Sequence, residues 1–277
     1  MKKLIINFTP TGMIPTREMT PYVPQTPQEI ASEILQCAGL GASMAHIHAR
    51  DETGKNTYKK EVFREIIARV REINKEMVIV VTTSGRSYTE FAERAEVLDL
   101  DGDVKPDMAS LTLGSVNFNK IASPNPPEII QRLAGKMREK GIKPELEIFD
   151  LGMVNYAHYL IRKDLIEPPY YFNIILGNIA SAQAKLLHLG LIVSELPDDS
   201  IWSVGGVGSW QKTVNAIGVV SGEGGVRVGL EDNIWYGDAR TILATNAMLV
   251  ERVAKLAALI GRPLATPRDV RCMLKLA

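Results

Sequence analysis

The segment 45–49, AHIHA, holds two of the chain's four histidines, two positions apart at the end of a short apolar run. Alternate side chains of a strand point to the same face, so His46 and His48 would project together at a spacing suited to one metal ion. The alternative is that the two imidazoles only line a polar strand face. Their spacing leaves both interpretations open.

The segment 227–233, RVGLEDN, ends another apolar run with an arginine, two carboxylates and an amide. A carboxylate such as Glu231, placed beside His46 and His48, would complete a set of two imidazoles and one carboxylate with a coordination position left open. That is the arrangement of a catalytic zinc rather than a structural one. The alternative is that residues 231–233 only cap the following helix.

Arg227 precedes Asp232 by five residues, and the two side chains are expected on the same side of the site. An arginine so placed lowers the pKa of the aspartate and keeps it ionised, so that it can act as a base at neutral pH. A buried ion pair with a purely structural role is the alternative.

Three further runs end in residues that suit a carboxylate substrate. The hydroxyls and backbone amides of 81–87, VTTSGRS, could hold a carboxylate, although such loops are often only turns. Ser110 and Thr112 are two positions apart, so their hydroxyls would share a strand face. In 145–150, ELEIFD, a glutamate pointing into a packed interior is costly without a cation, which makes Glu147 a site candidate.

The elements that must position these residues follow from hydrophobic patterning. Eight short β-branched runs alternate with amphipathic segments, which predicts a parallel sheet with helical crossovers. The predicted strands are 4–8, 44–48, 78–83, 108–112, 146–149, 172–176, 201–204 and 226–230, and the predicted helices are 27–38, 60–74, 88–96, 126–140, 153–163, 180–193, 210–220 and 238–260. The best-formed boundary is TPQE at 26–29, with a threonine cap, a proline and a glutamate in capping positions.

Eight such units in 277 residues favour one (β/α)₈ barrel, a fold that takes about 250 residues, over a doubly wound sheet. No linker, repeat or low-complexity tract divides the chain, so residues 1–277 are predicted to form a single domain. The carboxyl ends of barrel strands open onto one mouth. The eighth strand neighbours the first, so Glu231 could reach His46 and His48 after the second.

Composition excludes several classes of function. Lysine plus arginine and aspartate plus glutamate both number 32, so a nucleic-acid partner has no electrostatic support. No uncharged stretch reaches the roughly 18 to 20 residues of a membrane span. The two cysteines, Cys37 and Cys272, lie far apart in sequence, so no disulfide framework is expected and a cytoplasmic location follows by default.

Taken together, these motifs resemble those of the β-keto acid cleavage enzymes along essentially the whole chain. The matching segments are TG at 11–12, HIH at 46–48, TSG at 83–85, PELE at 144–147, GMV at 152–154, EDN at 231–233 and GRPLATP at 261–267. The resemblance implies a (β/α)₈ barrel, a zinc ion and a homo-oligomer, usually a tetramer. It also implies a reaction between a β-keto acid and acetyl-CoA that yields acetoacetate and a new acyl-CoA.

The same resemblance implies roles for individual residues. It assigns His46, His48 and Glu231 to zinc, and Asp232, paired with Arg227, to removal of a proton from the carbon between the two carbonyls. It places Thr82, Gly85 and Ser110 around the substrate carboxylate. In chemical terms, loss of that proton creates an enolate that needs a nearby positive centre, which zinc on the ketone oxygen would supply.

Two positions bear on the choice of substrate. Family members that take an amino substrate have a glutamate for its ammonium group, whereas this chain has Ile14, which cannot offset an ammonium's lost hydration. An uncharged, apolar far end is therefore expected. Arg86 stands where the typical member has a small residue and offers a competing interpretation, a second carboxylate on the substrate. A surface ion pair is the plain alternative for Arg86.

Three other functions use similar residues. A metal-dependent hydrolase of the amidohydrolase kind also has an HxH pair, but on its first strand and with further histidines at later strand ends. A non-haem iron oxygenase is compatible with two histidines and one carboxylate. A barrel that binds small molecules without catalysis is the third.

Overall fold

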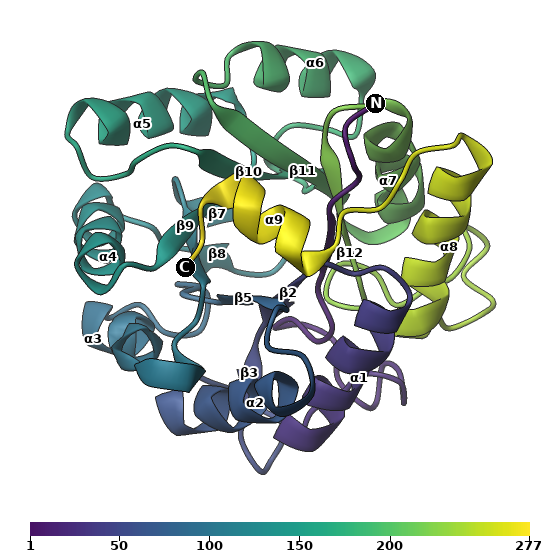
Figure 1. Ribbon diagram of the computed structural model, residues 1–277, viewed down its shortest axis with the longest axis horizontal. Coiled ribbons are helices and arrows are strands. Elements are labelled where there is room, and N and C mark those ends of the chain that lie inside the picture. The colour runs from purple at the N-terminus through teal and green to yellow at the C-terminus, as the bar shows by residue number, and fades with distance from the viewer.

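The computed structural model describes residues 1–277 and shows a closed barrel of parallel strands surrounded by helices (Figure 1). The barrel strands are β1 (Ile6–Phe8), β2 (Met44–Ile47), β5 (Val78–Val81), β6 (Met108–Thr112), β9 (Lys143–Ile148), β10 (Tyr170–Leu176), β11 (Ser200–Gly206) and β12 (Gly225–Val228). They pair in chain order, and β1 closes the ring by pairing with both β2 and β12. Each predicted run overlaps one of these strands, so the predicted (β/α)₈ barrel is confirmed.

The first seven helices lie in the connections between strands, and α8 and α9 follow the last strand. They are α1 (Pro27–Gly39), α2 (Lys60–Ile73), α3 (Phe91–Ala95), α4 (Pro127–Lys140), α5 (Leu151–Arg162), α6 (Leu186–Ser194), α7 (Gln211–Val220), α8 (Asn246–Leu259) and α9 (Pro267–Leu274). The predicted start of α1 is confirmed, because Thr26 and Glu29 form a complete capping box around Pro27. None of these helices is both long enough and apolar enough to cross a membrane.

Several predicted boundaries are wrong. The helix expected over 180–193 begins at Leu186, and the one expected over 238–260 begins at Asn246, where the Thr245 side chain accepts from the amide of Met248. The helix expected over 88–96 is reduced to α3 and is followed by 3₁₀ turns.

Three short elements were not predicted as such. Two are antiparallel hairpins that follow β2 and β6, made of β3 (Ala49–Arg50) with β4 (Asn56–Thr57), and of β7 (Val116–Asn117) with β8 (Ala122–Ser123). The third is helix α9, which lies across one end of the barrel in Figure 1.

The hydrophobic core has two parts. The larger lies between the strands and the surrounding helices, and the smaller fills the barrel near the amino ends of the strands. In the smaller part Val270 and Leu274 of α9 pack against Met44, Val78 and Met108. Helix α9 therefore closes the amino end of the barrel, and the carboxyl end is the end available for a site.

Candidate active site and metal centre

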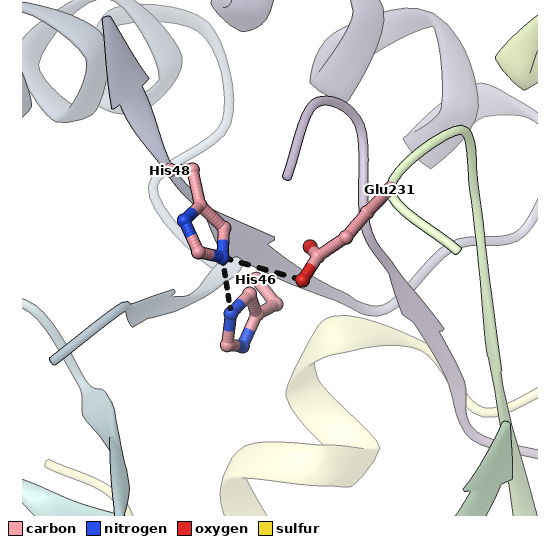
Figure 2. Close-up of side chains that lie close together, drawn as sticks. All are labelled: His46, His48 and Glu231. Atoms are coloured by element: carbon pink, nitrogen blue, oxygen red, sulfur yellow. Dashed lines mark hydrogen bonds and ion pairs between the residues drawn. The ribbon is translucent and has the colours of Figure 1, made fainter. Parts of the chain in front are cut away.

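Three side chains converge at the carboxyl end of the barrel (Figure 2). His46 belongs to β2, His48 follows that strand directly, and Glu231 comes from the loop after β12. The Nε2 atoms of the two imidazoles are 3.3 Å apart, and Nε2 of His48 is 3.3 Å from Oε1 of Glu231. The structure thus brings together the three residues that the sequence indicated for a metal.

Two of the three spacings between these donors fit a tetrahedral ion, and all three lie within 4.8 Å. Ligand atoms about 2.0 to 2.1 Å from such an ion lie about 3.3 to 3.4 Å from each other. Both histidines are buried, and the Oε2 atom of Glu231 is buried without a hydrogen-bond partner. Buried polar atoms are rarely left unpaired, so this orphaned oxygen is a further sign that the group faces a cation.

Glu145 orients His46, the first of these candidate ligands. Its Oε2 lies 2.6 Å from Nδ1 of His46, and its side chain is fully buried beneath the site. A carboxylate at this distance holds a proton on Nδ1, so Nε2 is the nitrogen that a metal ion would take in exchange for a proton. Burial opposes a charged imidazolium, but Glu145 and Glu231 outweigh it and raise the pKa of His46 to about 9.

Arg227 lies at the centre of a second cluster. Its Nε donates to Asp232 at 2.8 Å, and Nη2 donates to Glu231 at 2.6 Å. Its Nη1 lies 3.6 Å from Oε1 of Glu147. The predicted Arg227–Asp232 pair is therefore present, and the cation that an inward Glu147 requires is the same guanidinium.

The Arg227 guanidinium acts to lower the pKa of Asp232 as expected, but the net shift is not downward. Burial of the carboxyl raises that pKa and outweighs the opposing effect of the Arg227 guanidinium. The sequence showed the spacing of the pair but not the depth at which it lies.

The balance of charge around the two clusters also favours a cation. Four buried or nearly buried carboxylates, those of Glu145, Glu147, Glu231 and Asp232, share one permanent cation, Arg227. Buried carboxylates without compensation are strongly destabilising. A divalent ion between the histidines and Glu231 would offset two of the excess negative charges.

The capping alternative for residues 231–233 is wrong. The next helix, α8, does not begin until Asn246 and has its own cap at Thr245. Asn233 instead stabilises its own turn, accepting from the amide of Trp235 and donating to the carbonyl of the same residue. The carboxylates of Glu231 and Asp232 are therefore not used as helix caps and remain available to the site.

The hydroxyl residues gather at the ends of β5 and β6. The Ser110 hydroxyl accepts from the amide of Thr83 at 3.1 Å, and the Thr112 hydroxyl donates to Oε2 of Glu147 at 2.7 Å. Thr82 accepts from the amide of Ser84 at 3.2 Å. Each hydroxyl thus has a partner within the protein, which fixes its direction at the barrel mouth.

Glycine is required at two of the positions around the site. A Cβ on Gly12, whose φ is 64°, would lie 2.3 Å from Cγ of Glu231. A Cβ on Gly85 would lie 2.5 Å from the carbonyl oxygen of Pro124. The loops after β1 and β5 therefore approach their neighbours too closely for any side chain.

Proteins of named activity are similar to this chain along its whole length. The family model for β-keto acid cleavage enzyme matches residues 3–276. The chain is 38% identical to a 3-keto-5-aminohexanoate cleavage enzyme of Fusobacterium nucleatum over 277 residues, which cover 100% of this chain and 99% of that protein. The chain belongs to the β-keto acid cleavage enzyme family.

A second relative in this family, 3-oxoadipate:acetyl-CoA acetyltransferase of Cupriavidus necator, is 32% identical over 98% of this chain and 94% of its own length. A solved structure of apo ObcA superimposes with a TM-score of 0.77 at 21% identity, covering 92% of this chain and 66% of that one, which supports the fold. The chain is thus an enzyme of a family that cleaves β-keto acids by transfer to or from acetyl-CoA. This membership favours that chemistry over the hydrolase, oxygenase and non-catalytic interpretations.

The two positions singled out for substrate choice in this β-keto acid cleavage enzyme lie at the mouth. Ile14 is 48% exposed in the loop after β1, where Arg50 donates to the carbonyls of Gly12 and Pro15 at 2.8 Å each. Arg86 follows β5 and is half-buried, with its guanidinium carbon 3.8 Å from the ring centre of Phe118. It forms no ion pair, so the surface ion pair suggested for it is wrong.

Proposed function

We propose that this protein is a zinc-dependent β-keto acid cleavage enzyme that converts a β-keto acid without an amino group, together with acetyl-CoA, into acetoacetate and an acyl-CoA. One observation carries the proposal: His46, His48 and Glu231 converge within ligand distance directly beside the Arg227–Asp232 pair. A cation site and a base are therefore adjacent, as proton removal next to a ketone requires.

Zinc bound by these three residues would supply positive charge where negative charge develops on a keto oxygen. Asp232 takes the proton from the carbon between the ketone and the carboxylate. Arg227 holds Asp232 through two hydrogen bonds, of 2.8 and 3.1 Å, so the carboxylate keeps one orientation throughout. Thr82, Ser110 and the Gly85 backbone, at the ends of the next two strands, are proposed to hold the substrate carboxylate.

The remaining steps conserve atoms and charge. The enolate carbon attacks the thioester carbonyl of acetyl-CoA, forming a carbon–carbon bond and releasing the CoA thiolate. The thiolate attacks the original ketone carbon, and the bond between that carbon and the former enolate carbon breaks. Acyl-CoA is released, and Asp232 returns its proton to the carbon that becomes part of acetoacetate.

Ile14 supports the absence of an amino group on the substrate. Its loop offers no carboxylate between Thr9 and Thr16, so an ammonium group reaching this part of the mouth would lose hydration without an ionic partner. The relative from F. nucleatum carries the amino substrate in its name, and this chain is proposed to differ from it at this point.

The direct test is to incubate the zinc-loaded protein with acetyl-CoA and a set of β-keto acids and to measure acetoacetate and acyl-CoA by mass spectrometry. We expect equal amounts of the two products from at least one substrate without an amino group. Product from 3-keto-5-aminohexanoate in clear preference to all others would contradict the substrate assignment. Absence of acetoacetate from every substrate would contradict the activity.

We also propose that the protein acts in the cytoplasm as a homo-oligomer, a tetramer by resemblance to its family. Helix α6 supports association, because Leu186 and Leu187 are each 70% exposed on it and Leu191 is 48% exposed. Light scattering at micromolar concentration should give about four times the monomer mass of 30.5 kDa. A monomer mass would contradict the assignment.

A further inference from the structure

Arg86 is a half-buried cation without a counter-ion. No carboxylate lies within ion-pair distance of its guanidinium, and its buried Nε has no hydrogen-bond partner. The only hydrogen bond of the residue is from its backbone amide to the Ser84 hydroxyl, at 3.3 Å. Such a group is costly to keep half-buried unless an external anion completes it.

The guanidinium is held in place by aromatic packing. It stacks on Phe118, in the hairpin that follows β6, at 3.8 Å from the ring centre. Phe118 in turn meets Phe149, which follows β9, edge to face at 5.9 Å between ring centres. A stacked guanidinium keeps its N–H groups in a fixed plane, free to donate to a planar carboxylate.

The position of Arg86 relates it to the substrate. Arg86 directly follows Gly85 in the loop after β5, the strand that pairs with β2. Burial lowers the pKa of Arg86, and the negative charge of Glu231 opposes that effect. Arg86 and the proposed metal site therefore share the same mouth. A substrate held at the Thr82 and Ser110 end would extend its far end towards the loops that bear Arg86 and Ile14.

We propose that Arg86 selects a β-keto dicarboxylate by pairing with the second carboxylate, at the end of the substrate away from the ketoacid group. This inference rests on the proposed function and deepens it by naming the substrate class. Of the two interpretations left open by the sequence, it favours a substrate with a charged far end over one with an apolar far end. Ile14 is compatible with this choice, because it rejects an ammonium group without repelling an anion.

A second source of negative charge exists in the same reaction, the phosphates of acetyl-CoA. The substrate carboxylate is favoured because Arg86 lies within one strand of the ligands and beside the residues assigned to the ketoacid end. The phosphates of acetyl-CoA are separated from its thioester by the long pantetheine arm. Pairing with the substrate carboxylate affects kcat/KM for the dicarboxylate, whereas pairing with the phosphates affects the KM of acetyl-CoA.

The test compares 3-oxoadipate with 3-oxohexanoate, which have the same number of carbons and differ in the terminal carboxylate. We expect wild-type kcat/KM to be at least tenfold higher for 3-oxoadipate. Arg86→Gln should lower that value by about 10- to 100-fold, the usual effect of losing a charge-assisted hydrogen-bonding partner, and should change 3-oxohexanoate less than threefold. Arg86→Lys should recover part of the loss, since it retains the charge but not the planar fork.

A matched control is Arg132→Gln. Arg132 also stacks on a phenylalanine, Phe91, at 4.0 Å, but it lies on α4 outside the barrel mouth, and its loss should leave both substrates unaffected. An equal loss for both substrates in Arg86→Gln would contradict the proposal. So would an increase confined to the KM of acetyl-CoA, which would assign Arg86 to the phosphates.

Binding measured without turnover separates this inference from the proposed function. Calorimetry of 3-oxoadipate with the zinc-loaded protein should show an affinity that falls in Arg86→Gln. If that is observed while no acetoacetate forms with any substrate, the activity is wrong and the dicarboxylate site remains. Equal affinity in wild type and variant would contradict the site itself.

Discussion

Glu145 lies beneath the three proposed ligands and contacts one of them, His46. The carboxylate is completely buried, and besides His46 it accepts from the Asn7 side chain at 2.6 Å. Asn7 lies near Tyr171, whose hydroxyl donates to Ser203 at 2.8 Å. The orientation of one imidazole is therefore determined by a polar network inside the barrel, rather than by the strand that carries it.

Replacing Glu145 by glutamine should weaken zinc binding by about 10- to 100-fold, the usual cost of losing a carboxylate behind a histidine ligand. A chelator competition gives the dissociation constant directly. Glu147→Gln is the matched control, because Glu147 lies on the same strand face and near His46 but is hydrogen-bonded to Thr112 and paired with Arg227, with no hydrogen bond to an imidazole. Equal zinc affinities in wild type and Glu145→Gln would show that His46 needs no such support.

Asp232→Asn should lower kcat by about 10² to 10⁴, the range that a positioned base contributes, while zinc is retained. The amide keeps the shape of the carboxylate but cannot accept the proton. Exchange of the substrate's α-hydrogens into deuterated water, followed by NMR, should slow by the same factor. If exchange is as fast in the variant as in wild type, another group is the base.

At this scale the sequence indicated most of the site but not its depth. Strand alternation places Glu145 and Glu147 on one face, yet only Glu147 was named from the residues. Which of the two lies beside His46 depends on the register of β9 against β6 and on the curvature of the closed barrel. The raised pKa of Asp232 has the same origin, since spacing along the chain says nothing of burial.

The loops after β1 and β12 meet so closely that they act as one element. Glu231 donates its amide to the carbonyl of Thr9 at 3.2 Å, and Gly12 lies against its side chain. Glu231, the third proposed ligand, is thus positioned by the loop of the first strand, although it follows the eighth strand.

Gly12→Ala should displace Glu231 and lower zinc affinity at least tenfold, because the added Cβ would lie 2.3 Å from Cγ of Glu231. Gly102→Ala is a matched control: both glycines have a φ of 64°, and a Cβ on Gly102 meets nothing within 4 Å. Both variants should lose about 1 kcal/mol of unfolding free energy from backbone strain. Loss of zinc affinity in both, or in neither, would contradict the steric explanation.

Helix α1 offers a prediction on stability. Thr26→Ala removes the cap and should lower the free energy of unfolding by about 1 kcal/mol. Urea denaturation followed by circular dichroism measures the change. An unchanged midpoint would mean that the cap contributes nothing in this context.

Glu29 makes the stability contributed by the same cap depend on pH. Burial opposes its ionisation, but the Arg17 side chain and the amides of Thr26 and Gln25 outweigh burial and lower the pKa to about 2. A carboxyl with a lowered pKa stabilises the fold above its unfolded pKa, and that contribution disappears as pH falls from about 4.5 towards about 2. The stability difference between wild type and Glu29→Gln should therefore shrink over this range. A difference that is constant with pH would contradict this.

The elements themselves were well predicted where local signals were strong. The apolar period and the capping residues at Thr26 defined α1, whereas the segment 238–245 has an apolar pattern that continues into α8 without being helical. Leu243 of that segment forms an antiparallel β-bridge with Trp235, a pairing that no helical period reveals. Tertiary contacts determine where a helix such as α8 begins.

The whole molecule separates stability from chemistry at the two ends of the barrel. Helix α9 fills the amino end, where Arg271 also binds Asp107 at 2.8 Å. The buried Arg262 links the segment before α9 to the carbonyls of Lys2 and Gly218. The carboxyl end carries the polar clusters, so substitutions in the site are expected to change activity more than folding.

At the scale of the molecule, the barrel was predictable because eight runs of similar length repeat along one undivided chain. Helix α9 was not predictable as the element that closes the barrel. It is a short amphipathic segment after the last repeat, and nothing in its sequence indicates which end of the barrel it covers. Neither the repeat nor the closing helix determines which ion or which acid is bound.

The most direct test of the account is the zinc content of purified wild type and His48→Ala, measured by mass spectrometry together with acetoacetate formation. We predict one zinc per chain in wild type. In the variant we predict less than a tenth of that amount and no detectable acetoacetate, with circular dichroism unchanged. Full zinc content in His48→Ala, or acetoacetate formation by protein freed of metal, would contradict it.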